Sequence, residues 1–204
     1  MKLLKKLSIL LALCLACVFV FAACGQKKAE FSRGTISGNK YSNTFMGIQF
    51  EAPSDWTFAT DAELAEDNGL SESEFVDNFT TLVKNQQLYD MFAQRSDGTN
   101  ISIIVQNAKG MSKSSLKKEI ENAAPSVEEA LSGQGATDIS WKMSDVSIPL
   151  KDYAVLDVSS TLSGIKIYQK QVYALVDDYA YIITLTCVGE DESDEIYGYF
   201  KKLN

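Results

Sequence analysis

Histidine is absent from all 204 residues of the chain. It is the commonest general acid or base in enzymes and the commonest metal ligand near neutral pH. Its absence excludes every catalytic triad that uses an imidazole ring. A hydrolytic site would therefore depend on carboxylates, on a serine–lysine pair or on a thiol, and we expect neither a metal ion nor a cofactor.

Basic side chains are also scarce. The chain has 19 lysine and arginine residues against 27 aspartate and glutamate residues, which gives a formal net charge of −8. Nucleic acids are bound through Lys and Arg clusters that neutralise phosphates, so we expect no nucleic-acid partner. The same shortage argues against electrostatic docking onto anionic lipids.

A long hydrophobic run lies at the N-terminus. Three lysines within the first six residues precede residues 7–23, which are apolar apart from Ser8. The run ends on Ala22 and Ala23, directly before Cys24, and polar residues follow. A charged head, an apolar centre and a small-residue boundary are the parts of an export signal.

The tetrapeptide Phe21-Ala22-Ala23-Cys24 resembles the lipobox of bacterial lipoproteins, with Phe21 in place of the usual aliphatic residue. The resemblance implies that Cys24 receives a diacylglyceryl thioether and becomes the first residue of the mature chain, anchored to the cell membrane outside the cytoplasm. The alternative is an uncleaved transmembrane helix, because the run approaches the roughly 20 residues that span a bilayer. No Trp, Tyr or Arg anchor follows the run, which favours the lipoprotein.

Removal of residues 1–23 would change both the net charge and the number of cysteines. Three lysines and no acid are lost, which leaves 16 basic against 27 acidic side chains and a net charge of −11. Such a chain would depend on its lipid for membrane contact, and two acyl chains hold a protein stably where one does not. Cys187 would be the only cysteine besides Cys24, so acylation of Cys24 excludes an internal disulfide.

The remainder divides into a spacer and one domain. Residues 24–40 follow the signal, are mainly polar, and are typical of a short spacer that runs into a first edge strand. Residues 41–204 have the length of a single domain. Hydrophobic residues make up 46% of the chain and aromatic residues 10%, which is enough for a core.

Helices are predicted at four places. Capping boxes at 60–63 (T-x-x-E) and 71–74 (S-x-x-E) predict two helix starts. A helical region over about 112–131 is expected to break near Pro125, which suits the first turn of a new helix. Apolar residues at helical spacing in 196–203 predict a C-terminal helix.

Strands are predicted on both sides of the long helical region. Asp97-Gly98 predicts a hairpin between 89–94 and 100–107, and alternation predicts another strand over 139–143. Two-residue links force three long segments to be antiparallel neighbours. These segments are 153–162, 165–176 and 179–188. We therefore expect an α+β fold in which helices cover the faces of an antiparallel sheet.

The start of the domain carries a second resemblance. Ile48 and Phe50 alternate with polar residues before Pro53, and Trp56 follows the turn. This stretch resembles the start of Mog1/PsbP-like domains, where a strand of the form G-h-x-h-x-x-P precedes a buried tryptophan, and a class of Gram-positive lipoproteins built on that plan. The resemblance covers residues 41–56 and implies an α/β/α sandwich and a non-catalytic accessory role. We expect both Trp56 and Trp141 to be buried core residues.

Three patterns that suggest chemistry have simpler interpretations. Cys187 is in phase with the core side of a strand, which predicts a small buried hydrophobe. Residues 114–118 match S-x-x-K twice but lack the companion S-D-N and K-T-G elements of penicillin-recognising enzymes. The acidic run 190–195 lacks the spaced ligands and central glycine of a calcium loop, and it suits the start of a helix.

The candidate contact residues are Lys166, Tyr168 and Lys170, where an aromatic side chain alternates with two cations on an acidic protein. Exposed tyrosines are favoured at interfaces. We therefore expect a membrane-anchored, extracytoplasmic binding or accessory module without catalytic activity, whose partner is an envelope protein or a cell-wall component.

The alternative is a surface hydrolase or transferase that uses carboxylates. It would require two acids that converge in a pocket with perturbed pKa values. A structural envelope protein with no discrete site is a third interpretation.

Overall fold

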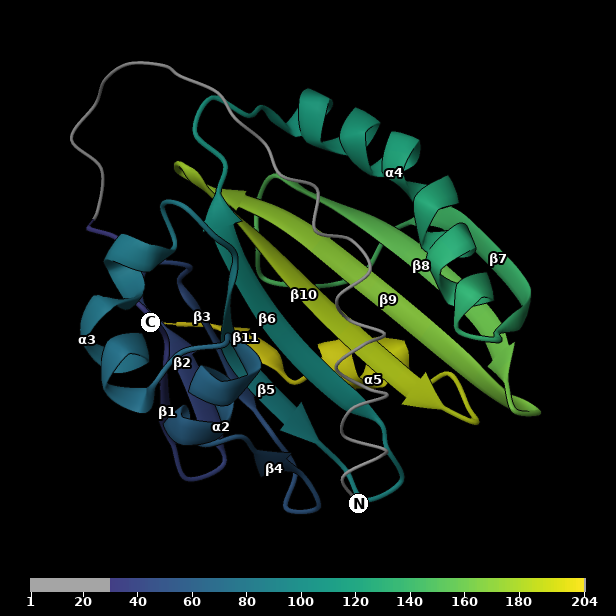
Figure 1. Ribbon diagram of the computed structural model, residues 1–204, viewed down its shortest axis with the longest axis horizontal. Helices are drawn as coiled ribbons and strands as arrows, with labels where there is room; N and C mark the ends of the chain where they lie inside the picture. Colours follow the sequence, from purple (N-terminus) through teal and green to yellow (C-terminus); the bar gives the residue numbers. More distant parts are fainter. Residues whose placement is uncertain (1–29, 204) are drawn as a thin grey trace.

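A computed structural model describes residues 30–203, so the predicted export signal and Cys24 lie outside the described residues. Within this range the chain forms two antiparallel sheets and four helices (Figure 1). The predicted α+β class with an antiparallel sheet is confirmed. The structure adds a second, smaller sheet, which lies against one face of the larger sheet.

The larger sheet has seven strands in the order β4-β5-β6-β10-β9-β8-β7. Their bounds are Thr57–Phe58 (β4), Leu88–Gln94 (β5), Asn100–Asn107 (β6), Thr137–Ser144 (β7), Tyr153–Leu162 (β8), Ile165–Val176 (β9) and Tyr179–Val188 (β10). The predicted hairpin is the pair β5 and β6, and the predicted meander is β8, β9 and β10. Both predictions are confirmed, because local turn signals set both pairings.

The smaller sheet has four strands in the order β1-β2-β3-β11. Their bounds are Thr35–Ser37 (β1), Lys40–Asn43 (β2), Ile48–Glu51 (β3) and Phe200–Lys202 (β11). The folded part therefore begins before the expected boundary at Tyr41, inside the stretch assigned to the spacer. Phe31 already packs on the core, where its ring stacks on Tyr179 with centroids 4.0 Å apart.

The C-terminal helix is shorter than predicted and ends earlier in the chain. Helix α5 (Ser193–Tyr197) ends at Gly198, and β11 follows and pairs with β3. Phe200 lies opposite Phe50 in this pairing, and their rings are 4.9 Å apart. Burial of Phe200 in the sheet takes the place of another helical turn.

The remaining helices begin where the sequence indicated. Helix α2 (Asp61–Asp67) is capped by Thr60, and α3 (Glu72–Leu82) is capped by Ser71. Helix α4 (Lys113–Gly133) runs through Pro125 without the expected break. Its buried stripe continues past the proline and packs on β7 and β8, so this packing outweighs the missing hydrogen bond. Among residues 30–203 no helix is long and apolar enough to cross a bilayer.

The two faces of the larger sheet have different neighbours. We call the face toward the smaller sheet and α5 the core face, and the face on which α4 lies the α4 face (Figure 1). The main hydrophobic core lies on the core face, where Tyr181 and Ile183 are fully buried. Trp56 is buried as predicted. Trp141 is only half-buried, because β7 is the edge strand of the sheet.

Candidate functional site

The three predicted contact residues lie together on the core face of β9, but they do not form the expected exposed patch. Lys166 is exposed and Tyr168 is half-buried, whereas Lys170 is buried. The Lys170 ammonium donates a hydrogen bond to Asp194 Oδ1 at 2.9 Å and lies 3.9 Å from Asp157 Oδ1. Burial alone would lower the pKa of Lys170, but the bond to Asp194 and the charge of Asp157 outweigh burial and raise it.

The expectation of two free cations beside an aromatic ring is therefore wrong for Lys170. Two of the three residues instead line a hollow of about 440 Å³, which we call the Tyr168 hollow. Its wall also contains Asp157 and Asp191. The lysine in this hollow is paired with acids from β8 and from the start of α5.

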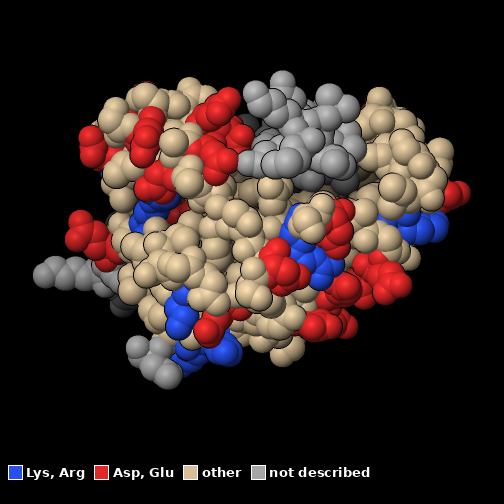
Figure 2. Space-filling model, turned by 90° about the horizontal axis from the view of Figure 1, so that it is seen from below, with Lys and Arg blue, Asp and Glu red and all other residues tan. Residues whose placement is uncertain are grey.

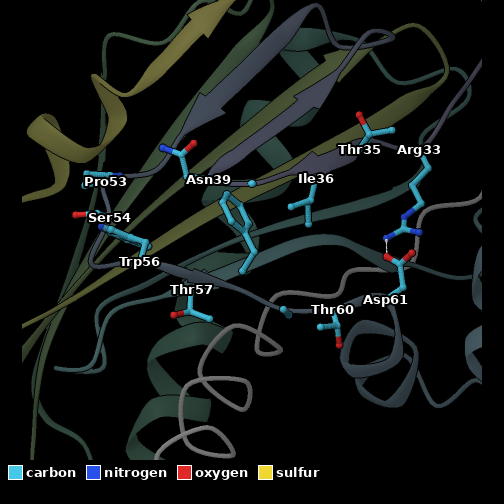
Figure 3. A pocket seen from close by; sticks show the side chains of 14 residues that line it. Arg33, Thr35, Ile36, Asn39, Pro53, Ser54, Trp56, Thr57, Thr60 and Asp61 are labelled. Atoms are coloured by element: carbon cyan, nitrogen blue, oxygen red, sulfur yellow. Dashed lines mark hydrogen bonds and ion pairs between the residues drawn. The ribbon is translucent and has the colours of Figure 1, made fainter.

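A larger cavity of about 740 Å³, which we call the edge groove, lies between β1 and β4 (Figure 3). Its lining combines apolar side chains, among them Ile36, Trp56 and Phe58, with an ion pair between Arg33 and Asp61. The groove joins two stretches of chain, 33–39 and 53–61, from different sheets. No local pattern marks it, because neither stretch forms a cavity by itself.

Both borders of the edge groove are edge strands. Within residues 30–203, strand β1 pairs only with β2 and strand β4 only with β5. Ser37 and Lys40 face each other across a two-residue turn, and such a closing pair exchanges both of its hydrogen bonds. Ile36 directly precedes Ser37, so its main-chain N–H and C=O point away from β2. Groups that point outward in this way at an open sheet edge can pair with an added chain.

The wall that carries β1 is held by a buried carboxylate. A bulge in β5 between Tyr89 and Met91 brings Asp90 to the core face. Asp90 accepts hydrogen bonds from the Gly34 N–H at 3.0 Å and from the Tyr41 hydroxyl at 2.6 Å. Burial raises the pKa of Asp90, while these two bonds act in the opposite direction.

The same wall has no room for a side chain at Gly34. A Cβ there would lie 2.2 Å from the Tyr41 ring. The preceding Arg33 lies over the Phe75 ring at 4.4 Å, in addition to its ion pair with Asp61. These contacts fix the entry of β1, so the edge groove is preformed rather than assembled on binding.

The residues considered for catalysis do not converge. Cys187 is buried, and burial raises the pKa of its thiol to about 11, which leaves it protonated at neutral pH. Ser115 belongs to the cap of α4, where it bonds with Ser112. Among the described residues no cluster of His, Cys, Asp or Glu could hold a metal ion.

The fold and the site define a class rather than a reaction: an α+β domain with a preformed groove between two open sheet edges. No known family model matches the chain, and comparison with curated proteins finds no significant relative. The functional argument therefore rests on the chemistry of the site.

Proposed function

We propose that this protein is a bacterial lipoprotein, anchored through Cys24 to the outer side of the cell membrane, that binds an extended segment of an envelope protein without catalysing a reaction. The edge groove carries the proposal. Its volume of about 740 Å³ is within the range of about 300–1,000 Å³ typical of ligand sites.

The occupant of the groove is an extended peptide because main-chain groups border it. In strand addition the hydrogen bonds of an open edge supply affinity, and pockets for alternate side chains supply specificity. The edge of β1 supplies the hydrogen bonds, and Trp56 and Phe58 supply the apolar surface. A peptide with an apolar residue between two polar ones fits this lining.

The lipid anchor would keep the groove close to the membrane. Arg33, at the end of the groove, follows Cys24 by nine positions, and a chain of that length spans at most about 30 Å. The partner is therefore a protein with an extended segment near the membrane surface. On the face shown in Figure 2, basic and acidic side chains are interspersed. The net negative charge of the chain gives little attraction to anionic lipids, so the lipid supplies the attachment.

The anchor is tested by fatty-acid labelling of cells. The wild type should take up label and remain in the membrane fraction, and Cys24→Ala should lose both. If the variant remains in the membrane without label, residues 7–23 act as a transmembrane anchor and the lipoprotein proposal is wrong.

The groove is tested by selection from a displayed library of random nine-residue peptides against the lipidated chain in detergent. Ile36→Pro removes the N–H that strand addition uses and is tolerated on an edge, while Ile36→Ala keeps that N–H. Peptides enriched on the wild type should bind Ile36→Ala with less than about a tenfold loss and should not bind Ile36→Pro. Equal binding to all three proteins would remove the groove from consideration.

The second candidate is a hydrolase or transferase that uses carboxylates. Asp157 and Asp191 both line the Tyr168 hollow, which is the kind of acid pair such an enzyme requires. The lysine beside Asp157 makes this arrangement more typical of a structural ion pair. Turnover of an envelope substrate that disappears in Asp157→Asn would favour the enzyme.

A further inference from the structure

Four strands form the open edges of the two sheets within residues 30–203: β1, β11, β4 and β7. Two of them carry features that discourage pairing with another chain. Strand β11 has the exposed Lys201 and Lys202. Strand β7 has the exposed Lys142 and an irregular register around Asp138, whose φ is 50°. Strands β1 and β4 have no charged residue, and these two unprotected edges border the edge groove.

Strand β4 presents outward main-chain groups, as β1 does. The Ala59 N–H donates to the Phe92 C=O at 2.9 Å, which marks these two residues as a hydrogen-bonded pair of the antiparallel ladder. Phe58 and Ala93 form the next pair, which is of the non-bonded kind, so the main-chain N–H and C=O of Phe58 point away from β5. Ile36 on β1 and Phe58 on β4 therefore each offer one donor and one acceptor at the borders of the groove.

Main-chain N–H groups farther along the two borders are bonded within the chain. The Gly34 N–H, two positions before Ile36, donates to Asp90 at 3.0 Å. The N–H of Thr60, two positions beyond β4, donates to Glu63 Oε2 at 3.0 Å in the cap of α2. An added chain therefore pairs mainly with the one residue that each border offers.

The two borders run in opposite directions, from Arg33 to Asn39 and from Trp56 to Asp61 (Figure 3). A strand placed between them is antiparallel to one border and parallel to the other. An antiparallel neighbour exchanges both of its bonds with one residue of the added strand, whereas a parallel neighbour bonds to the residues before and after that one. Because the main-chain groups of successive strand residues point to opposite sides, three consecutive residues satisfy both borders at once.

The charges of the groove cancel. Among the described residues that line it, only Arg33 and Asp61 are charged, and they form an ion pair with each other at one end. This pair links the two borders through side chains, so it leaves the outward main-chain groups unbonded. A charged residue in the middle of the ligand would find no counter-charge, and a neutral segment complements this lining.

We propose that the ligand of the edge groove is one uncharged strand that pairs with β1 and β4 at once and so joins the two sheets. This inference rests on the proposed function and narrows the class of partner. The central residue of the three lies beside Ile36 and Phe58, whose side chains pack on the core, so its own side chain is apolar. Its N–H and the N–H of the following residue are both bonded, whichever border is antiparallel. Proline is therefore excluded at these two positions.

The test uses the peptides that the nine-residue library enriches on the lipidated wild type in detergent. Each peptide bond of a ligand is replaced in turn by an ester, which removes one N–H without adding bulk. We expect a loss of affinity of tenfold or more at two adjacent positions, the apolar residue and the one that follows it. Addition to a single edge would give sensitive positions that alternate along the peptide, and that pattern would overturn the proposal.

Two protein variants test the contribution of β4. Phe58→Pro removes the outward N–H at an open edge, and Phe58→Ala is the matched control because it loses the same ring but keeps that N–H. The peptides should bind Phe58→Ala at least tenfold more tightly than Phe58→Pro, and equal binding would contradict the pairing with β4. If Phe58→Pro has a lower melting temperature than Phe58→Ala, the ester series on the wild type decides.

Failure of this inference is distinguishable from failure of the proposed function. If the peptides discriminate between Ile36→Ala and Ile36→Pro but bind Phe58→Ala and Phe58→Pro equally, β1 alone binds the ligand and only the joining of the two sheets is wrong. If no peptide is enriched, or if Ile36→Pro binds as well as Ile36→Ala, the edge groove is not a peptide site and both proposals are wrong.

Discussion

The two faces of the seven-stranded sheet are built from alternate residues of the same strands, yet along part of β6 the buried side chains of the two faces differ in chemistry. On β6, Ile101 and Ile103 point to the core face, and Asn100 and Ser102 point to the α4 face. All four side chains are buried. Burial of apolar groups stabilises a fold, whereas burial of polar groups stabilises it only when they are bonded. On β6 the core face therefore supplies apolar burial that stabilises the fold, whereas the polar groups of the α4 face contribute stability only where they are bonded.

The substitution with the largest expected effect tests the contribution of the core face to stability. Ile183 on the core face of β10 is fully buried, and truncation of such a residue to Ala typically costs about 2–5 kcal/mol. We expect Ile183→Ala to lower the free energy of unfolding by this amount in urea denaturation, in a single transition. Thr184→Ala, its neighbour on the α4 face, should cost much less. Equal losses would abolish the distinction between the faces, and two transitions would contradict a single domain.

The second prediction concerns the carboxylate that ties β1 to the core face. In Asp90→Asn the new amide would face the Asn43 amide, which now donates to Asp90 at 3.0 Å. One buried donor is then left unpaired, at a cost of about 1–3 kcal/mol. The Gly34 N–H keeps an acceptor in this variant, so we expect it to remain folded.

The cost of Asp90→Asn should depend on pH in a definite direction. Burial raises the pKa of Asp90 in the folded state above its unfolded value of about 3.9. The proton-linked stability of the wild type is therefore complete below about pH 4 and is lost as pH rises through the folded pKa. Asparagine does not titrate, so the cost should be greater at pH 3.5 than at pH 7. Unfolding measured for both proteins at each pH checks this, and a cost that grows with pH would place the folded pKa below the unfolded one.

Local signals account for the parts of the fold that the sequence predicted correctly. Capping residues set the starts of α2 and α3, and two-residue turns set the pairings of β8, β9 and β10. The errors arose where distant packing decides. Phe200 enters the smaller sheet because it pairs with Phe50 there. Lys170 is not a free cation, because it forms an ion pair with Asp194, 24 residues away.

The sites were harder to predict than the elements. Alternation of polar and apolar residues in β6 and β10 is typical of a strand with one solvent face, so it does not reveal that Ser102 and Thr184 are buried. The edge groove requires the relative position of two sheets, which no motif in the chain encodes. The period of two correctly predicts that Lys166, Tyr168 and Lys170 share one face of a strand, but nothing in the sequence predicts the Tyr168 hollow.

The substitution with the smallest expected effect on stability tests the difference between the two faces most directly. Ser102→Ala removes a hydroxyl group that has no hydrogen-bond partner in the described structure, so the substitution takes away a buried group that was not bonded. Removal of such a group is nearly neutral or stabilising, because no bond is lost and the desolvation cost disappears. We expect the free energy of unfolding to change by less than about 0.5 kcal/mol or to increase. The neighbouring Ile103→Ala on the core face should cost about 2–5 kcal/mol in the same urea experiment. A loss above about 1 kcal/mol for Ser102→Ala would show that the hydroxyl group is bonded in the folded protein, and the contrast between the two faces of β6 would then be lost.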